Sequence, residues 1–202
     1  ADIGRALGIP LIVDNTAAPV ICRPLDHGAA VVLYSGTKWI GGHGTSIGGL
    51  VIDGGNFDWE AYGERFPTLN RPDPSYHGAV WTEAVKPLGP IAYILRMRCT
   101  LLRDMGAAIS PFNSFQLIQG VETLPLRLRA HGENALKVAD FLKDHPKVSS
   151  VTFPGLQTGE ARRRADAYLT RSYGSLIGFE LKGGVEAGKK LIDSLNLFYH
   201  VA

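Results

Sequence analysis

Two segments of the sequence end in polar groups that could do chemistry together. The apolar run 11–13 is followed by Asp14, and the apolar run 31–34 is followed by the tetrapeptide SGTK at 35–38. These segments supply a carboxylate, two hydroxyls and an amine. A carboxylate can pair with a protonated pyridine nitrogen, hydroxyls can bind a phosphate, and a lysine can form a Schiff base. The pattern therefore favours a pyridine-type cofactor with a phosphate group.

Lys38 is the candidate nucleophile of this set. A lysine amine reacts only when it is partly neutral, and burial or a nearby cation lowers its pKa far enough. We therefore expect the Lys38 amine to be sequestered beside a buried acid, Asp14. Five glycines at 41, 42, 44, 48 and 49 would let the next loop approach a phosphate closely.

Each of these residues also has an ordinary structural interpretation. An Asp after a strand is more often a helix cap or turn residue, and a single lysine is usually solvated. Ser35 and Thr37 could simply begin a turn. A P-loop is disfavoured because the GxxxxGK[ST] spacing is missing and Trp39 stands where the hydroxyl residue would be.

The apolar runs themselves predict the elements that position these groups. Short, continuous, β-branched runs are typical of strands buried on both faces of a parallel sheet, and the 16 residues between Asp14 and Val31 suffice for a crossover. Ligands of open α/β sheets bind outside the carboxyl ends of the strands. A third strand is predicted at about 48–52, with its direction left open.

The remainder of the chain predicts a fold that is α/β throughout. We expect a long ordered loop at 54–78 and helices at 88–105, 111–119 and 123–144, the last stopped by Pro146. Strands and helices then alternate, at 148–153, 159–169, 175–181, 185–194 and 197–201. We assign 1–130 to the C-terminal part of a large cofactor-binding domain and 131–202 to the start of a smaller C-terminal α/β domain.

Composition excludes several classes of protein. Hydrophobic residues make up 45% and charged residues 20%, which is ordinary for a globular chain, and the net charge of +2 gives nucleic-acid binding no support. Cys22 and Cys99 suggest neither a disulfide framework nor zinc, and the six histidines show no metal-ligand spacing. No apolar run approaches the ~20 residues of a membrane span. A cytoplasmic protein is the simplest interpretation.

Segment 11–44 resembles the Cys/Met-metabolism family of pyridoxal-phosphate enzymes, which is related to cystathionine γ-synthase. The resemblance is carried by VDNT, by RPLDHG, and by SGTK followed by GGHG. It implies the aspartate-aminotransferase-like fold (fold type I), with a mostly parallel sheet and helices on both faces. It also implies residue roles: a pyridine-nitrogen partner, a neighbour of the ring, two phosphate ligands and the Schiff-base lysine, which are Asp14, Thr16, Ser35, Thr37 and Lys38.

Later segments are similar to O-acetylhomoserine sulfhydrylases within that family. The segments are GGHGTSIGG, the insert from FDWE to PDPSYHG, and LLRDMGAAISPFNSFQLIQGVETLPLR. The similarity implies γ-replacement in methionine biosynthesis: O-acetyl-L-homoserine and sulfide, or methanethiol, give L-homocysteine, or methionine, and acetate. Tyr76 and His77 in the insert are candidate substrate-entrance residues, although both could serve only to pack and cap the loop. The same resemblance implies a homotetramer of catalytic dimers.

Two alternatives stay open at this point. One is a cystathionine γ-synthase or γ-lyase of the same family, and the other is a non-catalytic α/β binding module in which Lys38 is an ordinary surface residue. Both ends of the chain read as interrupted elements. The resemblance places a glycine-rich phosphate loop, a ring-stacking aromatic residue and a Tyr and Arg from a dimer partner before residue 1. It places a carboxylate-binding Arg after residue 202, so we expect 1–202 alone to be inactive.

Overall fold

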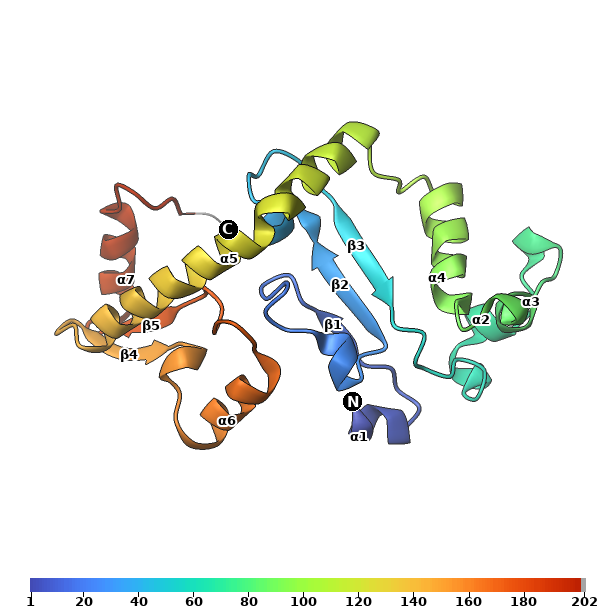
Figure 1. Cartoon of the computed structure of the whole chain (residues 1–202), viewed down its shortest axis with the longest axis horizontal. Coiled ribbons are helices and arrows are strands. Elements are labelled where there is room, and N and C mark those ends of the chain that lie inside the picture. Colours follow the sequence, from blue (N-terminus) through green and yellow to red (C-terminus); the bar gives the residue numbers. More distant parts are fainter. Residues whose placement is uncertain (201–202) are drawn as a thin grey trace. The chain divides into compact units, whose positions relative to one another are not determined.

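A computed structural model describes residues 1–200 (Figure 1). Contacts within the chain divide it into two compact units, Ala1–Pro125 and a second that begins at Leu126. The division falls inside a long helix. The assignment of 1–130 and 131–202 to a large and a small domain stays a prediction.

The first unit contains a three-stranded sheet in the order β1-β2-β3. Strand β1 (Ile12–Asp14) runs parallel to β2 (Val31–Ser35), and β3 (Gly49–Asp53) runs antiparallel to β2. The expectation of a mostly parallel sheet is therefore wrong for this chain, which has one pairing of each kind. The connection from β2 to β3 returns at the same end of β2: the Thr37 N–H donates to the Gly48 carbonyl at 3.3 Å and Ser35 pairs with Gly49. A strand that follows such a connection is antiparallel, because a parallel strand needs a crossover to the other end.

The start of the chain and the segment between β1 and β2 contain only short helices and turns. Helix α1 spans Asp2–Ala6, and the crossover from β1 to β2 consists of turns and one 3₁₀ helix, η1 (Pro24–His27). The first two residues of β2 are fully buried: Val31 and Val32 are 0% and 1% exposed, whereas the rest of the strand is partly buried. The prediction of an interior strand at 31–34 is thus confirmed for its first half.

Residues 54–105 form a series of short helices around an aromatic core. Where a loop was predicted at 54–78, the chain forms η3 (Gly63–Arg65), α2 (Pro67–Asn70) and η4 (Pro74–Tyr76). The series continues with α3 (Trp81–Ala84), η5 (Lys86–Leu88), α4 (Ala92–Met97) and the π-helical segment η6 (Arg98–Asp104). The rings of the aromatic cluster hold these pieces together and pack beside Ala30 and Val31 of the sheet: Phe57, Trp59, Phe66, Trp81 and Tyr93.

Helix α5 (Pro111–Lys143) is one continuous helix of 33 residues, although two helices were predicted. Pro125 lies inside it and removes one helical hydrogen bond, which usually favours a break. The buried positions nevertheless keep one helical phase across the proline, with spacings of 7, 4, 7 and 4 residues: Leu117, Leu124, Leu128, Ala135 and Ala139. Burial along a single face outweighs the local cost of the proline.

The second unit pairs β4 (Val148–Thr152) antiparallel with β5 (Gly178–Leu181). The connecting segments are η7 (Pro154–Leu156) and α6 (Gly159–Tyr168), and α7 (Gly184–Asp193) follows β5. Phe153 is 1% exposed and packs with Ala135 and Ala139. The predicted strand at 197–201 is wrong for 197–200, which form bends and irregular backbone; its last residue lies outside the described chain.

Across residues 1–200, none of the helices has both the length and the apolar character needed to cross a bilayer. In the same residues, no three His, Cys, Asp or Glu side chains gather where they could hold a metal ion.

Candidate active site

The parallel pairing brings the ends of β1 and β2 to the same edge of the sheet. Asp14 lies opposite Leu33, and the Asn15 N–H donates to the Leu33 carbonyl at 2.9 Å. One residue further on, the Thr16 hydroxyl accepts a 2.8 Å hydrogen bond from the Ser35 N–H. The ladder between the strands is thus extended by a side chain, and residues 14–16 are held beside Ser35 and the turn that follows it.

Asp14 is an ionised carboxylate at the surface of this chain. The side chain and the backbone N–H of Thr16 hydrogen-bond to it, and both lower the pKa of Asp14 below its ordinary value. The backbone bond, from the Thr16 N–H to Oδ1, is 3.0 Å long. The expectation of a buried acid is wrong for this chain: Asp14 is exposed, because β1 lies at the edge of the three-stranded sheet.

Lys38 lies in the middle of a tight π-type turn, η2 (Gly36–Ile40), with φ −88° and ψ −119°. The Gly41 N–H donates to the Gly36 carbonyl and the Gly42 N–H donates to the Lys38 carbonyl, each at 2.8 Å. These bonds fix the backbone, but the Lys38 side chain is exposed. The predicted sequestration of the amine is therefore also wrong for this chain, because no described segment covers the turn on that side.

The two predicted phosphate ligands differ in how they are used. The Thr37 hydroxyl donates to the Gly48 carbonyl at 3.3 Å and accepts from the Gly48 N–H at 3.1 Å, so it ties the turn to the start of β3. The Ser35 hydroxyl makes no hydrogen bond within residues 1–200, and its donor is free for a ligand. A phosphate would find an unused donor at Ser35 and would compete with Gly48 for the donor of Thr37.

Helix α5 supports the turn through Leu117 and Gly120. A Cβ placed on Gly36, Gly41 or Gly48 would lie within 3.0 Å of a Leu117 methyl carbon. A Cβ on Gly120 would lie 2.5 Å from the carbonyl oxygens of Ile40 and Gly41. Two of the glycines that the sequence suggested for a phosphate loop, Gly41 and Gly48, therefore also make room for α5, a role that was not predicted from the sequence. The signal was a glycine inside an otherwise helical pattern, which usually has a packing reason.

Tyr76 and His77 take part in a separate arrangement. The Tyr76 hydroxyl donates to Asp104 Oδ2 at 2.7 Å and accepts from Arg103 at 2.6 Å. Partial burial and then the bond to Asp104 raise the pKa of Tyr76 to about 12. His77 is exposed and closes η4 with φ 57°. Among the described residues, neither side chain is hydrogen-bonded to residues 14–16 or 35–38 at the strand ends, so their role at a substrate entrance stays a prediction.

The chain belongs to the Cys/Met metabolism PLP-dependent enzyme family, whose model matches residues 1–202. It is 50% identical to the O-acetyl-L-homoserine sulfhydrylase of Leptospira meyeri, over 97% of this chain and 46% of that protein. It is 45% identical to O-acetyl-L-homoserine sulfhydrylase 1 of Thermus thermophilus, over 100% of this chain and 47% of that protein. The chain thus spans about half the length of these curated relatives.

Solved structures of the family share the fold. One is described as an O-acetylhomoserine (thiol)-lyase of Campylobacter jejuni that carries a pyridoxyl-lysine monophosphate. It matches with a TM-score of 0.87 and 34% identity, over 100% of this chain and 49% of that one. A cystathionine γ-synthase of Xanthomonas oryzae in complex with aminoacrylate and cysteine matches with a TM-score of 0.73 and 30% identity, over 43% of its length. The chain therefore has an α/β structure that corresponds to about half of a fold-type I PLP enzyme.

Proposed function

We propose that the full-length protein is a PLP-dependent transferase that performs γ-replacement on O-acetyl-L-homoserine. Sulfide, or a small thiol such as methanethiol, would displace acetate to give L-homocysteine or methionine. The observation that carries the proposal is the shared edge of β1 and β2, where a carboxylate, three hydroxyl residues and a lysine follow the parallel strands. The identity of 45–50% to sulfhydrylases favours this reaction over that of the cystathionine enzymes.

The residues at this edge suit a pyridoxal phosphate. Asp14 is exposed and Thr16 lowers its pKa further below neutral pH, so it is an anion, the required partner for a protonated ring nitrogen. Ser35 has an unused donor for a phosphate oxygen, and the exposed Lys38 amine is available to a carbonyl carbon. The Gly36 backbone between them is pressed against Leu117, which keeps the turn close to the end of β2.

Each residue then has a definite task. Pyridoxal phosphate, when bound, supplies a carbonyl to which amines attach and a ring that withdraws electrons from the substrate. Lys38 would hold the cofactor and, once the substrate amine replaces it, carry protons between the α and β carbons of the substrate. Asp14 would keep the proton on the ring nitrogen, Thr16 would lie beside the ring, and Ser35 and Thr37 would bind the phosphate. Tyr76 and His77 would act at the substrate entrance.

Borohydride reduction of full-length protein loaded with pyridoxal phosphate tests the first part of the proposal. We expect peptide mapping to find the pyridoxyl group on Lys38. Unmodified Lys38 in a cofactor-loaded sample would overturn the assignment and favour a non-catalytic α/β module.

Acetate release from O-acetylhomoserine tests the reaction. We expect release with sulfide or methanethiol to exceed release with cysteine. Preference for cysteine would instead identify a cystathionine γ-synthase.

A cytoplasmic homotetramer of catalytic dimers is proposed on the same family basis, and sedimentation of the full-length protein tests the assembly.

A further inference from the structure

Asn15 is a buried polar residue between two residues of the proposed site. Asn15 is only 5% exposed, whereas Asp14 is exposed and Thr16 is half-buried. Its Nδ2 lies 2.9 Å from the Cys22 carbonyl, 3.2 Å from the Ala18 carbonyl and 2.9 Å from the Tyr34 hydroxyl. An amide has two N–H donors, so these three acceptors use its full donor capacity.

These bonds clamp the peptide that carries Asp14 and Thr16. Asn15 is held to β2 twice, by its N–H to the Leu33 carbonyl and by its side chain to Tyr34. The Thr16 hydroxyl accepts a hydrogen bond from the N–H of Ser35, the next residue of β2. Asn15 thus bonds to the Tyr34 side chain and Thr16 bonds to the Ser35 backbone, so residues 15 and 16 are tied to two successive residues of β2.

The direction of Asp14 follows from this clamp. Among residues 1–200, its side chain is hydrogen-bonded to Thr16, its neighbour two positions along. The direction of Asp14 therefore depends on the backbone at 14–16, which Asn15 holds together with the strand pairing and the bond between Thr16 and Ser35. Loss of the amide would leave two backbone carbonyls and a hydroxyl to find new partners, and the loop 15–22 would rearrange.

We propose that Asn15 is a positioning residue that orients Asp14 and Thr16 for the cofactor. The inference rests on the proposed function. It concerns how this chain prepares the site rather than which reaction takes place there.

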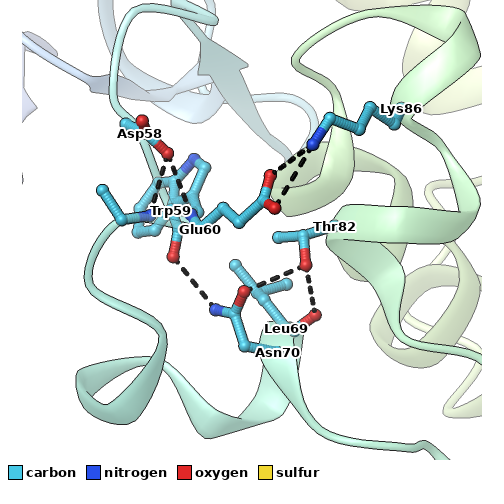
Figure 2. Close-up of polar contacts among 8 residues, drawn as sticks. Asp58, Trp59, Glu60, Leu69, Asn70, Thr82 and Lys86 are labelled. Atoms are coloured by element: carbon cyan, nitrogen blue, oxygen red, sulfur yellow. Dashed lines mark hydrogen bonds and ion pairs between the residues drawn. The ribbon is translucent and has the colours of Figure 1, made fainter.

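The test compares Asn15→Ala with Asn70→Ala in full-length protein. Asn70 is a matched control because its Nδ2 also donates to two backbone carbonyls, those of Trp59 and Phe66, each at 3.0 Å. Figure 2 shows the bond to Trp59. Its Oδ1 accepts from Thr82, and none of its partners belongs to the proposed site. Both variants should lower the melting temperature, so thermal unfolding provides the common scale.

The cofactor readouts should separate the two variants. For Asn15→Ala we expect a pyridoxal phosphate dissociation constant raised at least ~10-fold, an altered visible absorbance of the bound cofactor, and a kcat reduced about 10²-fold with KM nearly unchanged, the scale of a small misplacement of a reacting group. Asn70→Ala should keep the wild-type values of all of these. Equal cofactor affinity and absorbance in both variants would overturn the positioning role.

Tyr34→Phe decides the question if Asn15→Ala does not fold. It removes one of the three acceptors, and we expect a change of the same direction but smaller size in affinity and absorbance; no change would overturn the inference. Borohydride capture of Lys38 in the wild-type protein distinguishes failure of the positioning role from failure of the proposed function. If Lys38 of the wild type is captured and the variants match it, only the positioning role falls; if Lys38 is not captured, both proposals fall.

Discussion

Polar side chains are used in opposite ways at the ends of β1 and β2 and around the aromatic cluster. At the strand ends, backbone bonds hold the chain while Asp14 and Lys38 extend into solvent. Around the aromatic cluster, polar side chains bind one another, as in the 3.0 Å ion pair of Lys86 with Glu60 and the 2.9 Å bond from Thr82 to Asn70 (Figure 2). A cavity of about 460 Å³ lies beside that ion pair.

The difference separates a candidate functional site from a cavity that is merely empty space. The cavity near the aromatic cluster has volume, but its polar groups already have protein partners. The strand ends have little enclosure in this chain, but they hold chemically active groups in place with their donors, acceptors and charges still available. Available chemistry, rather than volume, is the basis on which the site is proposed.

The largest expected effect is on catalysis, from removal of the Lys38 amine. Lys38→Ala in the full-length protein should abolish borohydride capture and lower kcat by about 10²–10⁴-fold, the contribution typical of a positioned acid–base group. Lys86→Ala is the matched control, since it removes an exposed lysine that pairs with Glu60 and lies outside the proposed site. Capture that survives in Lys38→Ala would refute the assignment.

The next effect is on stability, from the aromatic cluster. Trp59 is 7% exposed and stacks on Tyr93 with ring centroids 4.9 Å apart. Trp59→Ala should lower the free energy of unfolding by about 3–5 kcal/mol in urea titration. Phe112→Ala removes an aromatic ring that is 67% exposed and should change it by less than about 0.5 kcal/mol. Equal losses would contradict the comparison.

A smaller effect on stability comes from the glycine of α5 that packs against the turn at the strand ends. Gly120→Ala adds a Cβ 2.5 Å from two backbone oxygens and should cost about 1–3 kcal/mol despite the better helix propensity of alanine. Gly188→Ala, in the interior of α7, meets nothing within 4 Å and should stabilise by up to about 1 kcal/mol. Thermal unfolding of both variants measures the difference, and the same sign for both would contradict this account of α5.

The smallest effect concerns pH. The pKa of Tyr76 is raised to about 12, above the ordinary value of 10.0, so the fold favours the neutral phenol. That stabilisation is complete below pH 10 and is lost as the pH rises towards 12, because the unfolded chain ionises first. Tyr76→Phe should therefore remove part of the decline in unfolding free energy between about pH 10 and 12. Parallel curves for the two proteins would show that the raised pKa is absent.

Local patterns predicted the strand ends well. Short apolar runs marked β1 and β2, and the polar residues after them fall where a parallel pair puts them. The direction of β3 was not readable, because it depends on a bond between Thr37 and Gly48 rather than on periodicity. The break expected in α5 between 119 and 123 was wrong for a related reason: the burial that keeps the helix continuous is spread over many turns and has no local signal.

The support of the site was beyond the reach of sequence patterns. Asn15 was passed over because a polar residue after a strand carries no mark of burial. Leu117 and Gly120 lie about eighty residues from the turn that they support, and such contacts exist only once the chain has folded. The exposure of Asp14 and Lys38 likewise depends on which segments surround them.

The Thr16 hydroxyl that extends the ladder has a thermodynamic consequence. Two strands normally fray where they diverge, and a ligand arriving there must order the loose ends as it binds. Here the ordering entropy of residues 14–16 is incurred during folding, through Thr16 and Ser35, so the cofactor of the proposed site would meet a preorganised surface. Order in this chain therefore extends two residues beyond the end of β1, where the proposed binding would benefit from it.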